Sequence, residues 1–189
     1  MVIVFLHGKG ADKNAYRSEI ETLASDIGAE AVSFNAPFEH QTKQKKYVWF
    51  NKVEQNGRCD AVAQEYLYSL QFIKEKLQQL SQPLSEVVLI GHSQGGGMAV
   101  AVALELDLKC AISICGDLPY NLTYQNNSKT PIYWFEGGQD TYISQERKNS
   151  YQILDELGGD MCYQKVLSCS HTEIKQAFVK IENILCSSK

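Results

Sequence analysis

The stretch VVLIGHSQGGG, residues 87–97, passes from four apolar residues to a serine enclosed by glycines. The apolar part is short and rich in β-branched residues, which favours a buried strand. Residues 98–104, which follow the glycines, are rich in alanine and favour a helix. The sequence therefore places Ser93 at a turn between a strand and a helix.

The pattern Gly91-x-Ser93-x-Gly95 is typical of a nucleophile elbow. In this turn the serine adopts a strained backbone conformation, and side chains two residues away on either side would clash. The helix that follows directs its N-terminal amides toward any negative charge formed near the serine. The pattern therefore predicts a site for acyl transfer at Ser93.

Length and composition limit the classes of protein to which the chain can belong. A length of 189 residues is enough for one domain with one core, so we expect a single domain over residues 1–189. The formal net charge is −4 and basic residues form no stripe, so nucleic acid is not an expected partner. Residues 1–6 are apolar, but they are too few to span a bilayer and lack the features of a signal peptide. We expect a cytoplasmic protein without stable membrane insertion.

The six cysteines indicate reduced thiols. No two of them form a C-x-x-C pair, so their spacing predicts neither a disulfide framework nor a zinc site. Buried free cysteines behave as small hydrophobes where thiols stay reduced, and the cytoplasm is a compartment that keeps thiols reduced. We expect no metal and no cofactor. The sequence does not determine the oligomeric state.

Short apolar runs alternate with longer amphipathic ones along the chain, which is the α/β pattern. Apolar strands without alternation are typical of a parallel sheet that is covered on both faces. The pattern predicts a doubly wound, mostly parallel sheet of about six strands. The expected strands are Val2–Leu6, Glu30–Phe34, Glu86–Ile90, Cys110–Cys115, Pro131–Phe135 and Cys162–Leu167. The expected helices are Asn14–Ile27, Arg58–Leu80, Gly96–Leu106, Ser144–Leu157 and Glu173–Leu185.

Ligands of such a sheet bind beyond the carboxyl ends of its strands. Serine, aspartate and histidine follow successive strands in the order Ser93, Asp140, His171. His171 lies between the last strand and the last helix, and we predict it to be the general base. Among the other histidines, His92 is next to the serine, where successive side chains diverge, and His7 is predicted to brace its loop by hydrogen bonds to the backbone.

Two aspartates are candidates for the acid, because Asp117 and Asp140 both follow strands at the expected edge of the sheet. We predict Asp140, since Gly137 and Gly138 allow a tight turn that aims its carboxylate at the imidazole. Asp117 stands near Pro119 and is more typical of a turn whose side chain caps local amides. Asp117 remains the alternative. The oxyanion hole is predicted to use the backbone amides of Gln94 and Lys9, of which the second follows the first strand.

Four motifs resemble those of the phospholipase/carboxylesterase group of α/β-hydrolases, which includes acyl-protein thioesterases. They are residues 5–10 (FLHGKG), 91–96 (GHSQGG), 115–119 (CGDLP) and 137–140 (GGQD). The resemblance covers nearly the whole chain and implies the triad Ser93, Asp140 and His171 with an oxyanion hole at Lys9 and Gln94. The family usually has Ser-Gly-x-Leu-Pro where this chain has Cys115-Gly-Asp-Leu-Pro.

The resemblance implies a minimal α/β-hydrolase fold. The chain starts on the strand that leads to His7, so the antiparallel edge strands of larger members are expected to be missing. Only residues 116–130 separate two strands where larger members insert a helical cap, so we expect no large cap domain and an open site. The long loop 35–57 contains Trp49 and Phe50, which either line a substrate pocket or anchor the loop to the core. Leu118 is a third pocket candidate.

The predicted function is a serine hydrolase that cleaves carboxylic esters or thioesters through an acyl-enzyme. Its expected substrate is a small-molecule ester or an acylated carrier. One alternative is another hydrolase activity on the same fold, such as a peptidase or a lactone hydrolase. A second alternative is a binding module that has kept the fold without catalysis.

Overall fold

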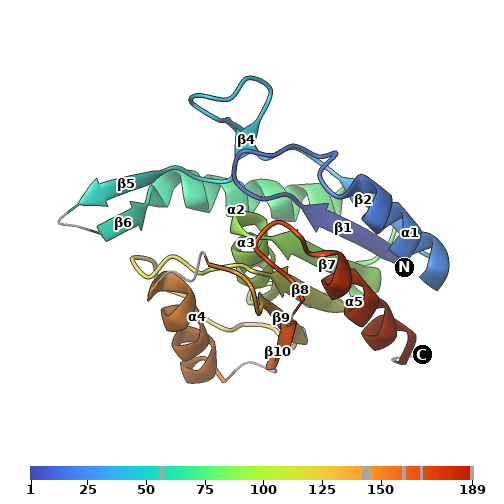
Figure 1. Ribbon diagram of the computed structural model, residues 1–189. Helices are drawn as coiled ribbons and strands as arrows, with labels where there is room; N and C mark the ends of the chain where they lie inside the picture. The colour runs from blue at the N-terminus through green and yellow to red at the C-terminus, as the bar shows by residue number, and fades with distance from the viewer. Residues whose placement is uncertain (56–57, 142–144, 159–160, 167, 188–189) are drawn as a thin grey trace.

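Six parallel strands form one central sheet in the computed structural model, which describes residues 1–55, 58–141, 145–158, 161–166 and 168–187 (Figure 1). The strand order is β10-β9-β8-β7-β1-β2, and each neighbouring pair is parallel. The bounds are β1 Val2–Leu6, β2 Glu30–Ser33, β7 Val87–His92, β8 Cys110–Ile114, β9 Ile132–Gly137 and β10 Met161–Val166. The predicted doubly wound sheet is confirmed.

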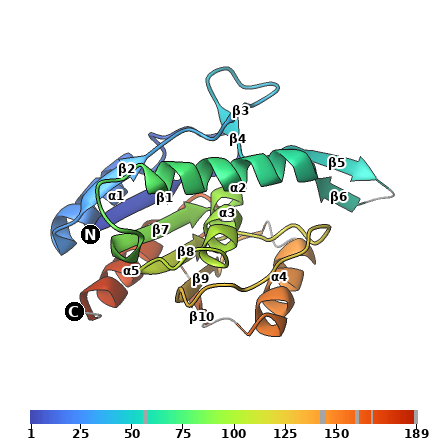
Figure 2. The same ribbon diagram turned by 180° about the vertical axis from the view of Figure 1, so that it is seen from behind.

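Helices cover both faces of this sheet. They are α1 Arg17–Ile27, α2 Ala63–Gln78, α3 Gln94–Ala103, α4 Gln145–Glu156 and α5 Lys175–Ser187, with a short 3₁₀ helix η1 at Leu84–Glu86. Figures 1 and 2 show α1 and α5 on one face and α2, α3 and α4 on the other. This two-sided cover explains why the central strands are apolar without a break.

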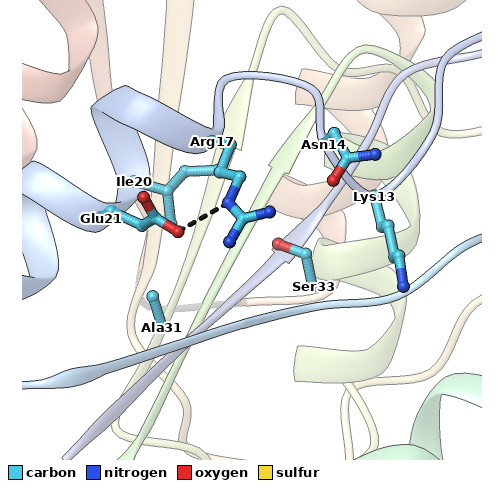
Figure 3. Close-up of a pocket in the computed structure, with 7 residues that line it drawn as sticks. All are labelled: Lys13, Asn14, Arg17, Ile20, Glu21, Ala31 and Ser33. Atoms are coloured by element: carbon cyan, nitrogen blue, oxygen red, sulfur yellow. Dashed lines mark hydrogen bonds and ion pairs between the residues drawn. The ribbon is translucent and has the colours of Figure 1, made fainter.

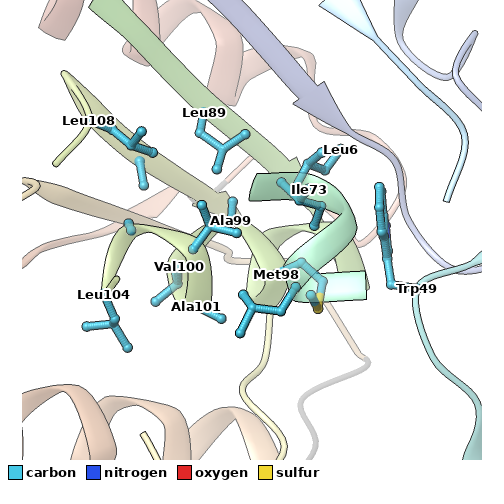
Figure 4. Close-up of a cluster of buried hydrophobic side chains, with 14 of the residues drawn as sticks. Leu6, Trp49, Ile73, Leu89, Met98, Ala99, Val100, Ala101, Leu104 and Leu108 are labelled. Atoms are coloured by element: carbon cyan, nitrogen blue, oxygen red, sulfur yellow. The ribbon is translucent and has the colours of Figure 1, made fainter. Parts of the chain in front are cut away.

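Successive residues of a strand enter different cores because their side chains point to opposite faces. In β1, Leu6 packs into the core beneath α2 and α3, while Phe5 packs into the core beneath α1 and α5. Figure 4 shows the first of these cores, where Met98 of α3 and Ile73 of α2 meet the sheet. Both faces of the strand are thus buried, and the sheet is fixed between two apolar layers.

The chain changes direction between β1 and β7. It runs from β1 outward to β2, returns to β7 on the other side of β1, and then continues outward through β8, β9 and β10. In open α/β sheets, ligands bind at such a switch point, in the crevice beyond the carboxyl ends of its two strands. The loop after β1 and the turn after β7 therefore flank the predicted position of the site.

Two small antiparallel hairpins replace the structure that the sequence predicts for residues 35–61. The predicted long loop contains β3 Phe38–Glu39, β4 Tyr47–Val48 and β5 Lys52–Gln55. The first residues of the predicted helix Arg58–Leu80 form β6 Arg58–Ala61, which pairs with β5. The helix prediction was wrong for these residues because pairing with β5 satisfies their backbone. Residues 56 and 57 of the predicted loop lie outside the described residues.

The β5–β6 hairpin extends beyond the end of α2 and is tied to the segment that follows β8 (Figure 2). Asn121 both accepts a hydrogen bond from the amide of Ala61 (3.1 Å) and donates one to its carbonyl (3.0 Å). The hydroxyl of Tyr120 donates to the Asp60 carboxylate. These contacts fix the direction of the hairpin relative to the sheet.

Several predicted ends differ by a few residues. The helix predicted from Asn14 begins at Arg17, because Tyr16 has a left-handed backbone conformation with φ 52°. Ser144 and Leu167, predicted as the ends of a helix and a strand, lie outside the described residues. Residues 115–131, between β8 and β9, contain no helix or strand. The prediction that no large cap domain interrupts the fold is therefore confirmed.

Candidate active site

Ser93 lies between β7 and α3 with a strained backbone, at φ 53° and ψ −122°. The turn brings backbone segments so close that side chains do not fit. A Cβ atom on Gly91 would lie 2.1 Å from the carbonyl oxygen of Gly95, and one on Gly95 would lie 2.3 Å from that of Leu6. Both glycines are therefore required by packing, and the turn has the geometry of a nucleophile elbow.

Ser93, His171 and Asp140 form a continuous row of side chains. The Nε2 atom of His171 lies 3.0 Å from Ser93 Oγ, and its Nδ1 atom lies 2.9 Å from Asp140 Oδ2. The Asp140 side chain is fully buried, whereas 23% of the His171 side chain is exposed. A neutral imidazole with its proton on Nδ1 fits these distances, because it donates to the carboxylate and accepts from the serine hydroxyl.

The turn that carries Asp140 is bonded to the loop that carries His171. The amide of Gly138 donates to the carbonyl of Val166 (2.9 Å), and the amide of Gln139 donates to that of Cys169 (2.9 Å). A Cβ atom on Gly137 would lie 2.7 Å from the Cys169 carbonyl oxygen, so this approach also depends on glycine. The ends of β9 and β10 thus hold the carboxylate and the imidazole together.

Asp117, the alternative acid, faces another partner. Its carboxylate lies 3.2 Å from the ammonium group of Lys52, which begins the β5–β6 hairpin. Its carbonyl oxygen lies against α3, where a Cβ atom on Gly97 would approach it to 2.0 Å. The structure therefore brings Asp140 to His171 and assigns Asp117 to the contact between the hairpin and the segment after β8.

His92 and Tyr16 hold the backbone of the His171 loop. The Nε2 atom of His92 lies 2.6 Å from the carbonyl oxygen of His171, and the Tyr16 hydroxyl donates to the carbonyl of Thr172 at 2.8 Å. The ring of His92 lies 5.3 Å from both the ring of Tyr16 and the ring of His171. Burial raises the pKa of Tyr16 to about 12, so its hydroxyl remains a donor at neutral pH.

Sequence reasoning missed both residues. The side chain of His92 reaches the carbonyl of His171, in the loop that carries the imidazole. The only signal was the place of His92 at the end of a strand that leads into the elbow. Tyr16 is 156 residues from its partner in the chain, and no pattern links the two.

The two residues predicted to form the oxyanion hole belong to different segments, Gln94 to the start of α3 and Lys9 to the loop after β1. Gln94 is the first residue of α3, and its side chain accepts from the amide of Trp49 (2.9 Å) and donates to the carbonyl of Phe50 (2.7 Å). Lys9 is exposed and follows Gly8, where a Cβ atom would lie 3.4 Å from the Cβ of Ser93. The loop after β1 therefore lies directly against the serine.

His7 braces this loop through backbone bonds, as predicted. Its Nδ1 atom lies 2.8 Å from the carbonyl oxygen of Gly8, and its Nε2 atom accepts from the amide of Ala36 at 3.0 Å. Burial lowers the pKa of His7, which favours a neutral ring with its proton on Nδ1.

The candidate pocket residues Trp49, Phe50 and Leu118 are all buried, with exposed fractions of 0%, 2% and 0%. The indole of Trp49 donates to the carbonyl of His7 (2.8 Å) and packs beside Met98 in the core of Figure 4. Of the two interpretations of loop 35–57, anchoring to the core is the one that the packing of Trp49 and Phe50 favours. Their burial leaves them no open face toward a substrate.

A separate cavity of about 220 Å³ lies beside the start of α1 (Figure 3). Arg17 and Glu21, which line it, form an exposed ion pair with a distance of 2.7 Å between Nε and Oε1. Exposed pairs of this kind occur widely on protein surfaces and contribute little energy. Ser93, His171 and Asp140 do not line this cavity.

None of the helices in the described ranges is long and apolar enough to cross a membrane.

Comparisons with known proteins identify the fold and the family of the chain. The structure is similar to that of esterase PE8, with 22% sequence identity over 98% of this chain and 91% of that chain and a TM-score of 0.80. It is also similar to acyl-protein thioesterase 2 of Zea mays, with 17% identity over 98% and 92% of the two chains and a TM-score of 0.80.

A carboxylesterase of Bacillus cereus is similar over 100% of this chain and 88% of its own, with 15% identity and a TM-score of 0.76. These likenesses confirm the α/β-hydrolase fold. No curated protein sequence matches the chain. The family description "phospholipase/carboxylesterase", however, matches residues 1–188. The elbow, the strand order and this match over nearly the full length lead to one conclusion: the chain belongs to the phospholipase/carboxylesterase family of α/β-hydrolases.

Proposed function

We propose that the protein hydrolyses carboxylic esters or thioesters with the triad Ser93, His171 and Asp140. The observation that carries this proposal is the row of contacts from Ser93 Oγ to His171 Nε2 (3.0 Å) and from His171 Nδ1 to Asp140 Oδ2 (2.9 Å). These distances lie in the range that a nucleophile, its general base and an orienting carboxylate require.

The reaction follows from these roles. Ser93 Oγ attacks the acyl carbon while His171 Nε2 takes the hydroxyl proton, and Asp140 stabilises the imidazolium that forms. The tetrahedral intermediate collapses, His171 returns the proton to the leaving alkoxide or thiolate, and an acyl-enzyme remains. A water molecule then attacks the acyl carbon with His171 again as base, and the carboxylic acid and free Ser93 are released.

The charge on the intermediate needs fixed donors. We assign the backbone amides of Gln94 and Lys9 to this oxyanion hole, since Gln94 begins α3 and Lys9 belongs to the loop that lies against Ser93. The two hydrogen bonds of the Gln94 side chain to residues 49 and 50 support the assignment, because they fix the residue whose amide is required.

His92 and Tyr16 act as positioning residues in this proposal. They bond to the carbonyls of His171 and Thr172 and so fix the backbone from which the imidazole extends. A base held in this way keeps its Nε2 atom at the nucleophile during proton transfer, which lowers the cost of reaching the reactive geometry.

The proposed substrates are small-molecule esters or acyl groups carried on another molecule. The absence of inserted structure between β8 and β9 supports an open site, and the similarity to esterases and an acyl-protein thioesterase supports the bond type. All six cysteines are free, which supports a reducing, cytoplasmic location. Peptidase or lactone hydrolase activity remains the alternative on the same triad.

The test uses Ser93→Ala, with Ser170→Ala as control. Ser170 is in the His171 loop but accepts a hydrogen bond from the amide of Glu173 instead of taking part in the row. We expect Ser93→Ala to stay folded, to lose labelling by a fluorophosphonate probe, and to lose several orders of magnitude in kcat on p-nitrophenyl esters. Ser170→Ala should keep both. Hydrolysis by Ser93→Ala at the wild-type rate would refute the proposal.

A panel of p-nitrophenyl esters and acyl thioesters with increasing acyl length separates the two bond types. Peptide and lactone substrates belong in the same panel, because a higher kcat/KM on either would favour the alternative activity. A protein that reacts with the fluorophosphonate probe but turns over none of these substrates would need a different acyl donor.

A further inference from the structure

Cys115 brings a third metal-binding side chain to the imidazole and carboxylate of the candidate site. Cys115, Asp140 and His171 each offer one ligand atom, and the three atoms all lie within 4.8 Å of one another. The thiol comes from the end of β8, the carboxylate from the end of β9 and the imidazole from the loop after β10. Three different strand ends thus converge on one point.

The backbone conformation of Cys115 fixes where its side chain begins. The residue has φ 53°, a left-handed conformation that is unusual for a side chain other than glycine, and its amide donates to the carbonyl of Phe135 at 2.8 Å. The side chain is buried, with an exposed fraction of 0%. The backbone of Cys115 is therefore fixed, and its buried thiol lies within 4.8 Å of the other two ligand atoms.

Sulfur, imidazole nitrogen and carboxylate oxygen are the donors that Zn²⁺ prefers. The bond lengths of a tetrahedral zinc site place its ligand atoms about 3.3 to 3.8 Å apart. The pair His171 Nδ1 and Asp140 Oδ2, now at 2.9 Å, would need to open by about half an ångström to match this spacing. The imidazole can make that adjustment because its side chain is partly exposed.

We propose that Cys115, Asp140 and His171 bind a thiophilic divalent cation of the Zn²⁺ type, with solvent as the fourth ligand. The cation binds the Cys115 thiolate, one Asp140 oxygen and His171 Nδ1. The thiol proton passes to solvent, and the imidazole proton moves from Nδ1 to Nε2. Metal binding to protein thiols releases protons in this way because the thiolate is the ligand.

Inhibition is the consequence, and this part rests on the proposed function. With its proton on Nε2, His171 has no lone pair to accept the proton of Ser93, so the base is lost. Its Nδ1 atom is bound to the cation, so Asp140 no longer stabilises an imidazolium. A cation at this cluster therefore switches the hydrolase off, and a chelator switches it on again.

Binding is tested with Co²⁺, which replaces Zn²⁺ and gives a thiolate-to-cobalt charge-transfer band in the near ultraviolet. Wild type should show the band. Cys115→Ser should lose it and need at least about tenfold more Co²⁺ for half-saturation. Loss of a residue that only hydrogen-bonds to a metal ligand already costs about 10–100-fold in metal affinity, and Cys115 is a direct ligand in this proposal. Cys115→Ser keeps a side chain of similar size, and its ester hydrolysis without metal should stay close to wild type.

Exposed thiols are the main source of error, so the control changes all three of them. A variant with Cys59, Cys162 and Cys186 replaced by serine should keep the band, because none of these exposed residues belongs to the cluster. His171→Ala provides a second ligand test if Cys115→Ser fails to fold. It should also raise the half-saturating Co²⁺ concentration at least about tenfold. Wild-type binding by His171→Ala, or a band that survives in Cys115→Ser, would overturn the proposal.

The hydrolysis assay separates this proposal from the proposed function. Zn²⁺ should inhibit wild type reversibly, and Cys115→Ser should need at least about tenfold more Zn²⁺ for the same inhibition. A cobalt band without any ester hydrolysis by the metal-free protein would refute the function and leave the site in place. Ester hydrolysis without a Cys115-dependent band would refute the site and leave the function in place.

Discussion

His171 is held at its ring and at its backbone by different parts of the chain. Asp140 contacts Nδ1 of the ring, while His92 and Tyr16 bond to the carbonyls of residues 171 and 172. The proposed role of His171 as the general base needs this kind of support, because a displacement of about 1 Å can cost about 100-fold in rate. Two predictions separate the support of the ring from the support of the backbone.

The first prediction compares the two aspartates. Asp140→Asn should lower kcat by about 10² to 10⁴ with little change in KM, because its interaction with His171 grows only as the imidazole becomes charged. Asp117→Asn should change kcat by less than about threefold, since it breaks only the partly exposed pair with Lys52. Steady-state kinetics on one p-nitrophenyl ester decides. A large loss in Asp117→Asn alone would make it the triad acid.

The second prediction concerns His92. His92→Phe keeps the ring that packs against Tyr16 and His171 but removes the donor, so kcat should fall about tenfold at unchanged KM. His92→Gln keeps an N–H donor without the ring and should recover most of this loss. Equal losses in both variants would mean that His92 contributes packing rather than position. The downfield proton resonance of the His171–Asp140 hydrogen bond provides an independent measurement.

The turn from β7 into α3 depends on backbone contact with β1. In the third prediction, Gly95→Val should abolish both folding and activity, because even its Cβ atom would lie 2.3 Å from the Leu6 carbonyl oxygen. Gly28→Val is the control: Gly28 also has a positive φ, but a Cβ atom there meets nothing within 4 Å. It should cost about 1 to 2 kcal/mol and leave the enzyme active. Soluble, active Gly95→Val would contradict the elbow.

Sequence patterns predicted the strands better than the hairpins. The bounds of β1 agree at both ends, since Val2–Leu6 is a continuous apolar run buried on both faces. The pair β5–β6 was missed because its strands are polar and short. The dipeptide Asn56-Gly57, whose conformation lies outside the described residues, is the sequence signal that favours a hairpin there.

The same distinction applies to the site. Ser93, Asp140 and His171 could be predicted to lie together because each follows a predicted strand, and parallel strands end at one edge. Tyr16 and Cys115 were missed because their contacts depend on positive φ values and on tertiary distance, which periodicity does not report. Cysteine spacing could not reveal the cluster of Cys115, because its three ligand atoms come from different strand ends.

The stability of the molecule as a whole should depend on the neutral form of His7. Burial lowers its pKa below the ordinary value of 6.5, so in that range the unfolded chain binds a proton that the folded chain does not. The contribution of neutral His7 to the free energy of unfolding is therefore complete above about pH 6.5. It is lost as the pH falls toward the pKa of His7 in the folded protein.

The fourth prediction follows from this linkage. Urea unfolding of wild type should show a steeper loss of unfolding free energy below about pH 6.5 than unfolding of His7→Gln, which does not titrate there. The two hydrogen bonds of His7 mean that His7→Gln is also less stable at neutral pH, so the slopes are compared and not the absolute values. Equal slopes would show that His7 binds protons equally in the folded and the unfolded protein, so that folding does not lower its pKa.

The strand order distributes the proposed machinery between the middle and the border of the sheet. Ser93 follows β7, which has a neighbour on each side, whereas the loop of His171 follows β10, which pairs with β9 alone. Edge strands belong to the parts of a protein that open locally at a lower free energy than global unfolding. Catalysis should therefore be lost through partial opening of the sheet edge at β9 and β10 while the core around β7 is still folded. Activity then measures the local stability of that edge, and not the stability of the whole sheet.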